Sequence, residues 1–290
     1  MTLLISVLLV ASLTVLLATS AIGLGLALLG TGRTPATATG AGSIVVTRPG
    51  HRLGGRLVAS LAGAFVLLAA AVVLRAVLVG HAPWSNLHEF SIAFAAATLG
   101  TYLVLARAYP IAGLAPVIGL IAAGLVAFAL ALENRADPLV PALQQPFLLT
   151  VHVGSAALAY AVAAVAFAAA TAEIAQRASG DGIELLPPAA VARAVGHRAV
   201  LLGFPILTIA IALGSVWANL AWRSYWSNDP KELAAAATWL VFGAYLHVAG
   251  RRDRWERLAP WLIVAGFLGV LFTYIGAGLF IVGEHSYGGA

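Results

Sequence analysis

The sequence predicts an all-α fold: a polytopic integral membrane bundle of about eight transmembrane helices, with both termini outside. Hydrophobic residues make up 61% of the 290 residues and charged residues only 9%, a composition that soluble domains do not have. Apolar runs of about 20 residues recur along the chain, and a helix of that length crosses a hydrocarbon core of ~30 Å. The placement of the basic residues then gives the expected orientation.

Polar, glycine or proline residues separate the apolar runs and so predict the ends of the spanning helices. The first run has no basic residue ahead of it and is longer than the apolar core of a signal peptide, so we expect it to remain as a helix. In order, the predicted helices span 2–30, 54–80, 88–108, 111–131, 147–175, 198–217, 232–249 and 260–282.

Basic residues gather at one predicted end of the bundle. Twelve of the sixteen Lys and Arg residues lie in or beside the loops at that end, and the positive-inside rule places those loops in the cytoplasm. Both termini and the loops 81–87, 132–146 and 217–231 are then expected on the extracytoplasmic side of the plasma membrane. The twelve are Arg33, Arg48, Arg52, Arg56, Arg107, Arg177, Arg193, Arg198, Arg251, Arg252, Arg254 and Arg257.

The net charge of +5 does not indicate a nucleic-acid partner, because the basic residues are scattered among short loops rather than gathered with aromatic residues on one face. We expect membrane lipid around the chain and no nucleic acid. The chain has no cysteine, which excludes disulfides, thiolate metal sites and a c-type haem attachment motif on the chain itself.

A tryptophan-rich segment, residues 217–232, joins the sixth and seventh predicted helices. Trp217, Trp222 and Trp226 lie within ten residues of one another, with Tyr225 beside them. On a short helix, Trp222 and Trp226 would share one face and offer a flat apolar surface to a large planar ligand. An aromatic belt at the membrane interface is the alternative interpretation.

The end of this segment carries a helix-start signal. Asp229 suits the N-cap, Pro230 the first helical position and Glu232 the third, which predicts the start of the seventh helix. Lys231 is the only lysine of the chain and is not needed for that signal. Its ammonium group suits a carboxylate such as a haem propionate, or equally a lipid headgroup.

Two histidines are expected at the level of the Trp-rich segment. His152 lies near the outer end of the fifth predicted helix, and His285 follows the eighth. Two neutral imidazoles on opposite faces of a porphyrin are a standard form of haem iron ligation, so the pair predicts a bis-histidine site. Each histidine alone would more often be an ordinary interfacial residue.

His247 lies about fifteen residues into the seventh predicted helix, or roughly 22 Å from its outer end. An ionisable residue at that depth is a functional candidate that faces a partner helix or a cavity, although a side chain reaching the inner interface is the alternative. Near the start of the third helix, Ser85 or Asn86 is expected to cap the helix ahead of His88 and Glu89.

Several motifs occur in a fixed order along the chain, and each one alone would be a weak signal. They are Pro83-Trp-Ser-Asn-Leu-His-Glu89, Val151-His-Val153, Gly203-Phe-Pro-Ile-Leu-Thr208, Trp217-Ala-Asn219, Ala221-Trp222, Tyr225-Trp226, Asp229-Pro-Lys-Glu232, Thr238-Trp239, Tyr245-Leu-His247 and His285-Ser-Tyr-Gly288. With these motifs the sequence resembles the ResC/CcsA-type cytochrome c assembly proteins, members of the haem-handling superfamily with a tryptophan-rich "WWD" region. The resemblance is strongest over about 146–290.

The resemblance implies a haem-binding subunit of a cytochrome c synthase, which presents haem for thioether attachment to the Cys-X-X-Cys-His motif of apocytochrome c. It implies noncovalent haem b at an external site, with His152 and His285 as axial ligands. His247 would belong to a second haem site within the membrane, shared with a ResB/CcsB-type partner, and thiol-reducing maturation proteins would take part. The residues implied around the external haem are Trp217, Trp222, Arg223, Tyr225, Trp226, Asp229 and Lys231.

The sequence departs from the family pattern at four positions: Leu220 replaces Glu, Arg223 replaces Gly, Asn228 replaces Trp, and Ala234 replaces an aromatic residue. Arg223 could offer a propionate a bidentate contact.

We expect the four helices of 1–146 to form one region and the haem-handling helices of 147–290 another. The rival hypotheses are a small-substrate transporter subunit with an aromatic outer gate, which requires facing polar groups at mid-depth, and a purely structural assembly subunit.

Overall fold

The computed structural model describes residues 1–29, 50–133, 146–251, 255–277, 281 and 283. Eight long α-helices run through these residues, which contain no strand. The helices are α1 (Thr2–Leu29), α2 (Gly50–Val79), α3 (Leu87–Ala108), α4 (Ala115–Ala131), α5 (Pro146–Ser179), α6 (Ala189–Trp222), α7 (Pro230–Val248) and α8 (Trp255–Leu271).

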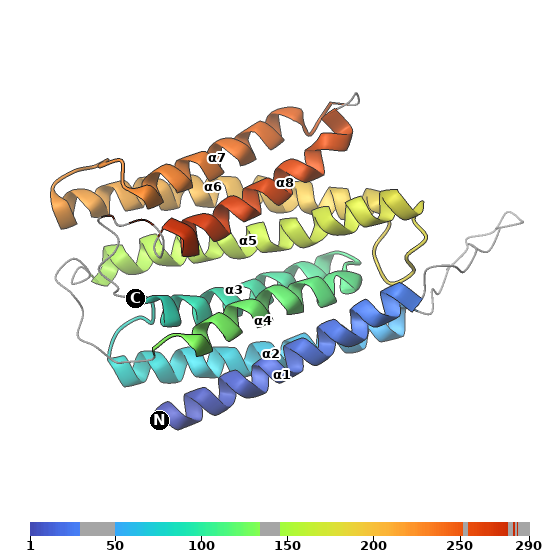
Figure 1. The fold of residues 1–290 in the computed structure, drawn as a ribbon, viewed down its shortest axis with the longest axis horizontal. Coiled ribbons are helices and arrows are strands. Elements are labelled where there is room, and N and C mark those ends of the chain that lie inside the picture. Colours follow the sequence, from blue (N-terminus) through green and yellow to red (C-terminus); the bar gives the residue numbers. More distant parts are fainter. Residues whose placement is uncertain (30–49, 134–145, 252–254, 278–280, 282, 284–290) are drawn as a thin grey trace, which may run out of the picture.

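Seven of the eight helices are long and apolar enough to cross a membrane. The exception among the described helices is α7, whose first turn carries Lys231 and Glu232 and so lowers its mean hydropathy. α7 nevertheless runs alongside α6 and α8 in the same bundle (Figure 1). The expected all-α membrane bundle is confirmed, and the chain is a multi-pass membrane protein.

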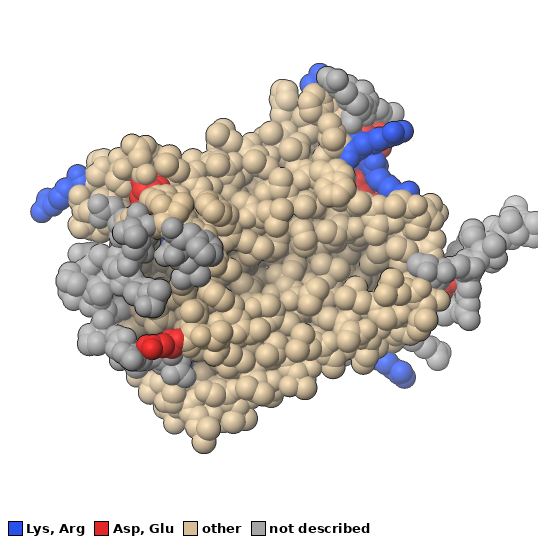
Figure 2. Space-filling model, viewed as in Figure 1, with Lys and Arg blue, Asp and Glu red and all other residues tan. Residues whose placement is uncertain are grey.

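Successive helices alternate in direction, so α1 begins and α8 ends at the same end of the bundle (Figure 1). The turn before α3 and the segment between α6 and α7 also lie at that end. Figure 2 shows most of the visible lysine and arginine atoms at the opposite end. This separation agrees with the charge asymmetry of the sequence, while the side on which each end lies stays a prediction.

Two helices differ most from their predicted bounds. α6 begins at Ala189 rather than 198, because its first turns bury Ala192 and Val195 against the bundle, and it continues through Trp222 instead of ending at 217. α8 begins at 255 rather than 260 and passes into a π-helical turn, Phe272–Gly276, where we predicted an unbroken α-helix. The irregular connection between α6 and α7 is therefore only residues 223–229.

α5 is the most buried of the seven membrane-crossing helices and packs along α6, α3 and α8. At the end opposite to the Trp-rich segment, an ionic cluster joins three of these helices. The buried Glu173 lies 2.6 Å from the Arg177 guanidinium and 3.0 Å from that of Arg193, and Arg193 also lies 2.6 Å from Glu256. The cluster links α5, α6 and α8 where charged groups are expected at a membrane interface.

Close contact between α1 and α4 depends on glycine. A Cβ atom on Gly23 would lie 2.9 Å from Pro116 Cβ and closer still to Pro116 Cγ, and one on Gly119 would lie 2.6 Å from Ser20 Oγ. Small residues of this kind let membrane helices approach at backbone distance. The proline ring beside Gly23 has no rotamer that would relieve such a clash.

We expect Gly23→Ala to lower the free energy of unfolding by about 1–3 kcal/mol, because the methyl group overpacks the rigid ring of Pro116. The matched control is Gly25→Ala in the same helix, where a Cβ atom meets nothing within 4 Å. Thermal unfolding in detergent should show a lower midpoint for the first variant and an unchanged or higher one for the second. Equal midpoints would contradict the proposed packing.

Candidate functional site

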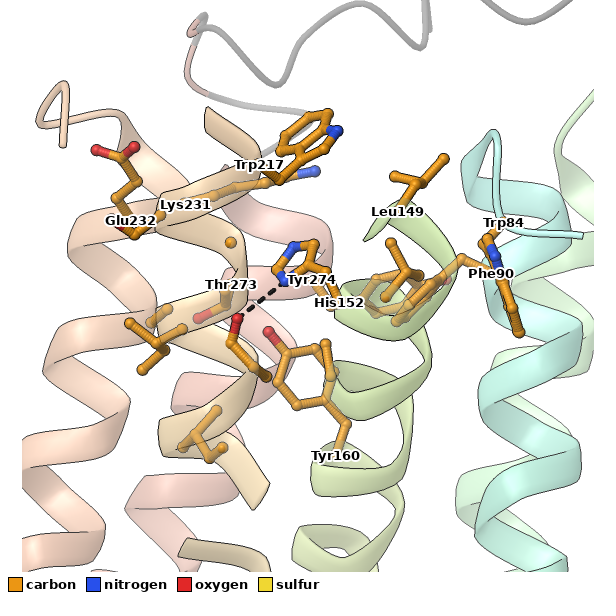
Figure 3. A pocket seen from close by; sticks show the side chains of 18 of the residues that line it. Trp84, Phe90, Leu149, His152, Tyr160, Trp217, Lys231, Glu232, Thr273 and Tyr274 are labelled. Atoms are coloured by element: carbon orange, nitrogen blue, oxygen red, sulfur yellow. Dashed lines mark hydrogen bonds between the residues drawn. The ribbon is translucent and has the colours of Figure 1, made fainter. Parts of the chain in front are cut away.

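A cavity of about 240 Å³ lies near the end of the bundle that holds the Trp-rich segment. Its lining comes from α5, α6, α7, the π-helical turn after α8, and the turn and first residues of α3 (Figure 3). The lining is mainly apolar and aromatic with a few polar groups, which is typical of a site for a small molecule or cofactor. Its largest side chains include Trp84, Phe90, Tyr160, Trp217, Trp226 and Tyr274.

His152 projects from α5 into this cavity (Figure 3). Its Nδ1 lies 2.9 Å from the carbonyl oxygen of Ala210 on α6. Because a carbonyl oxygen only accepts hydrogen bonds, Nδ1 carries the hydrogen and Nε2 carries the lone pair. A ligating histidine needs this arrangement, with one nitrogen oriented by the protein and the other able to bind a metal.

The imidazole of His152 is packed between α6 residues. Its ring is nearly parallel to that of Trp217, with 6.1 Å between centroids and 11° between planes. A Cβ atom on Gly214 would lie only 2.7 Å from His152 Cε1, so a side chain there would occupy the space of the ring. Trp217 is itself buried, and Trp222 meets it edge to face at 5.0 Å. His152 thus has a fixed position and orientation.

The prediction that Trp222 and Trp226 share one face of a short helix is wrong, because α6 ends at Trp222 and Trp226 lies in the irregular segment. Trp226 and Tyr225 line the cavity, while Trp222 supports Trp217 without lining it. The Ser215 hydroxyl donates to the carbonyl of Tyr225 at 2.7 Å, which brings the segment back over α6. The aromatic surface is therefore assembled from a helix and a loop.

Two of the departures from the family pattern occupy left-handed backbone positions. Arg223 has φ of +63° and ends α6, with its N–H donating to the carbonyl of Asn219 at 3.1 Å. Asn228 has φ of +59°, and its Oδ1 accepts from the indole N–H of Trp226 at 2.9 Å. Glycine suits the first position best, and asparagine tolerates the second well. Arg223 is exposed and does not line the cavity.

The predicted start of α7 is confirmed. Asp229 is buried, and its Oδ1 accepts from the backbone N–H of Lys231 at 2.8 Å. Glu232 Oε2 accepts from the backbone N–H groups of Ser227 at 2.8 Å and Asp229 at 3.2 Å, which completes a capping box. Asp229 therefore stabilises the helix start without lining the cavity, whereas Lys231 does line it.

The π-helical turn places Thr273 and Tyr274 in the lining of the cavity. The Tyr274 hydroxyl hydrogen-bonds to Ser91, and its ring lies 5.1 Å from that of Phe90 and 5.8 Å from that of Phe94. Single π-helical turns are frequent at functional sites because they redirect side chains within an otherwise regular helix. Here the turn brings α8 into contact with α3 beneath the cavity.

Sequence analysis did not identify the ion pair that supports the turn before α3. Arg75 Nε lies 2.9 Å from Glu89 Oε1, and both side chains are buried. Glu89 Oε2 accepts from the backbone N–H of Ser85 at 2.9 Å and its hydroxyl at 2.7 Å, while Asn86 caps α3 as expected. The position of Arg75 inside a predicted apolar helix could have indicated this pair, because a charge within the membrane needs a partner of opposite charge.

Of the other two predicted histidines, His247 does not line this cavity. His247 is exposed on α7. His285 lies outside the described residues. Gly283, two residues before it, contacts the start of α7, since a Cβ atom there would lie 2.8 Å from Pro230 Cδ.

Residues 84–285 match the family model described as cytochrome c assembly protein. The chain belongs to this family. The match includes every residue that lines the cavity. Membership in the cytochrome c assembly family agrees with the family resemblance seen in the sequence.

Several relatives named cytochrome c biogenesis protein CcsA are similar to this chain over most of its length. That of Parasynechococcus marenigrum is 35% identical over 258 residues, covering 77% of this chain and 83% of the relative. That of Chlamydomonas reinhardtii is 37% identical over 219 residues, covering 72% of this chain and 62% of the relative. The structure named cytochrome c haem lyase CcmF aligns with a TM-score of 0.66 at 21% identity, over 93% of this chain and 46% of that one, which shows a shared fold.

We expect Arg223→Gly to raise the free energy of unfolding by about 0.5–1 kcal/mol, because glycine adopts the left-handed conformation without steric cost. Ala221→Gly, two residues earlier within α6, is the control and should lower stability by a similar amount. Unfolding midpoints in detergent test both changes. A loss of stability in Arg223→Gly would contradict the prediction. It would mean that contacts of the arginine side chain stabilise the fold by more free energy than the left-handed backbone conformation costs.

Proposed function

We propose that this chain is the haem-binding membrane subunit of a cytochrome c synthase. It holds haem b without a covalent bond and presents it on the extracytoplasmic face for attachment to apocytochrome c. The observation that carries the proposal is the oriented imidazole of His152 inside an aromatic cavity, in a chain of the cytochrome c assembly family. The plasma membrane is the proposed location.

The residues around the cavity fit a haem group. Imidazole is a standard axial ligand of haem iron, and the Ala210 carbonyl orients His152 so that Nε2 is the ligating atom. Gly214 leaves the space in which the imidazole lies. Aromatic side chains such as Trp217, Trp226 and Tyr225 suit the apolar faces of the ring.

The second axial ligand in this proposal is His285. The contact of Gly283 with the start of α7 supports it, because two further residues span at most about 7 Å. Gly283, from which the chain continues to His285, therefore lies close to the first turn of α7, which carries Lys231. Bis-histidine ligation saturates the iron and suits a protein that transfers haem rather than one that activates oxygen.

Other predicted residues take indirect or peripheral roles. Lys231 lines the cavity and suits a propionate. Arg223, exposed at the end of α6, can contact a propionate only at the edge of the site. Trp222 supports Trp217, and Asp229 fixes the first turn of α7, from which Lys231 projects. Both act through the residues that they position.

His247 is proposed to belong to a separate haem site in the membrane, completed by a histidine of a ResB/CcsB-type partner. Its exposure supports this role, because the exposed face of α7 can meet another membrane protein. A buried histidine bonded within the bundle would not be available to a partner.

The division of the chain into two regions at residue 146 stays a prediction. The cavity is lined by residues of both regions, because residues between 84 and 90 also contribute to it.

The work of the chain is positioning. Bound haem would supply two vinyl groups. Each thiol of apocytochrome c adds across one of them, so that one S–C and one C–H bond replace the S–H bond and the C=C π bond. The chain holds the ring in a fixed orientation so that the reacting groups meet as if in one molecule. Thiol-reducing maturation proteins are proposed to keep both thiols reduced, because a disulfide cannot add to a vinyl group.

We expect the purified protein, with its natural partner, to show the sharp reduced bands of b-type haem. His152→Gly should lose most of the haem attributable to the external site, because the iron loses an oriented ligand. Added imidazole should restore the bands, since it can enter the space left by the side chain. Optical spectra of oxidised and reduced protein, with haem content per chain, test this result.

The control for histidine content is His81→Ala, which removes a histidine at the same end of the bundle that does not line the cavity. Gly214→Ala keeps His152 but displaces its ring and should weaken the same bands, whereas Gly154→Ala, where a Cβ atom meets nothing within 4 Å, should not. Unchanged spectra in both His152→Gly and Gly214→Ala would exclude the proposed site.

A further inference from the structure

Tyr160 lines the inner end of the cavity. It lies on α5 about two turns further from the Trp-rich segment than His152, or roughly 12 Å along the helix axis. Ala156 lies between them and also lines the cavity, so the small methyl side chain leaves the space between the two larger ones open. Figure 3 shows the hydroxyl end of Tyr160 directed toward His152.

The hydroxyl of Tyr160 has no hydrogen-bond partner among the described residues. Tyr160 is only 8% exposed, yet its oxygen is not one of the side-chain atoms that are sealed from solvent, so the surface that it keeps faces the cavity. Phe90 and Phe94 hold the ring, with centroids 6.4 and 5.9 Å away. A hydroxyl in apolar surroundings costs free energy until it is hydrogen-bonded, which indicates a role toward a ligand.

Thr273, from the π-helical turn, adds an acceptor to the lining. Its hydroxyl donates to the carbonyl of Gly269 at 2.8 Å, which leaves the lone pairs of the oxygen available. Figure 3 shows Thr273, like Tyr160, on the inner side of His152. Among the described residues that line the cavity, the charged ones both belong to the first turn of α7, at the outer end. The inner end therefore offers a hydroxyl donor and a hydroxyl acceptor without a charge.

A neutral carboxyl group fits this pair of hydroxyls. It accepts a hydrogen bond at its carbonyl oxygen and donates one from its own hydroxyl, and apolar surroundings favour the neutral form over the charged one. Haem b carries methyl, vinyl and propionic acid groups at its periphery, and only the acid groups can make these bonds. Its vinyl groups lie on the opposite side of the ring, where thiols that arrive from outside the membrane must reach them.

We propose that Tyr160 is a specificity-determining residue whose hydroxyl donates to a carboxyl group of the bound planar ligand at the inner end of the cavity. Thr273 accepts from the same group. The inference rests on the proposed binding of haem and adds an orientation to it, with one propionic acid group directed inward and the vinyl edge toward the mouth. The other propionate is the one for which Lys231 is proposed.

Tyr160→Phe tests the proposal, because it removes the hydroxyl and keeps the ring between its neighbours. The protein with its partner is titrated optically with haem and with iron etioporphyrin, whose ring carries only alkyl groups. The bands lost in His152→Gly define the external site. Haem binding at that site should weaken roughly five-fold, the effect of one hydrogen bond between neutral groups, while binding of iron etioporphyrin should not change.

Two further comparisons separate recognition from packing. Tyr102→Phe removes another buried tyrosine hydroxyl, which donates to the carbonyl of Ile111 at 3.2 Å and does not line the cavity, so it should alter neither affinity. Thr273→Val removes the acceptor and should weaken haem binding by a similar factor as Tyr160→Phe. Thr273→Ser keeps the hydroxyl and should retain the affinity for haem.

Equal weakening of haem and iron etioporphyrin binding in Tyr160→Phe would overturn the proposal, since the hydroxyl would then not meet a carboxyl group. Unchanged haem binding would also overturn it, because water would then satisfy the hydroxyl. Both outcomes leave the proposed function intact, provided that the His152→Gly spectra still show the external site. Absence of haem binding in the unsubstituted protein would overturn the proposal and the proposed function together.

Discussion

The hydrogen bond from His152 Nδ1 to the carbonyl of Ala210 is the interaction on which the proposed site depends. It fixes the tautomer of the imidazole and directs Nε2, and it joins α5 to α6 at the depth of the cavity. Gly214 and Trp217 complete this arrangement, one by leaving room and the other by covering the ring. A change in the packing of α5 against α6 would therefore alter the ligand geometry directly.

The membrane explains why charge lies where it does. With no water in the hydrocarbon, buried charges must be paired within the protein. The described part of the bundle has such pairs near both ends: Arg75 with Glu89 beside the cavity, and Glu173 with Arg177 and Arg193 at the other end. The first pair supports one side of the proposed haem site. The second joins three helices, which keeps the opposite end of the bundle together.

The sequence was sufficient for features that depend on local chemistry. Apolar runs predicted the helices, and the Asp229 to Glu232 signal predicted the start of α7. His152, singled out by its place near a helix end, lines the cavity. That Trp84 lines the cavity was not predicted, because this depends on the packing of α3 near α5. The extension of α6 to Trp222 was also not predicted, since aromatic residues that follow an apolar run are compatible with either a helix or a loop.

The central claim is that His152 ligates haem iron within the aromatic cavity. A cryo-electron microscopy structure of the haem-loaded protein with its partner is the most direct test. The account predicts iron bonded to His152 Nε2, with the ring between the Trp-rich segment and the turn that carries Trp84. Haem density found only beside His247, with no iron bonded to His152 Nε2, would contradict it.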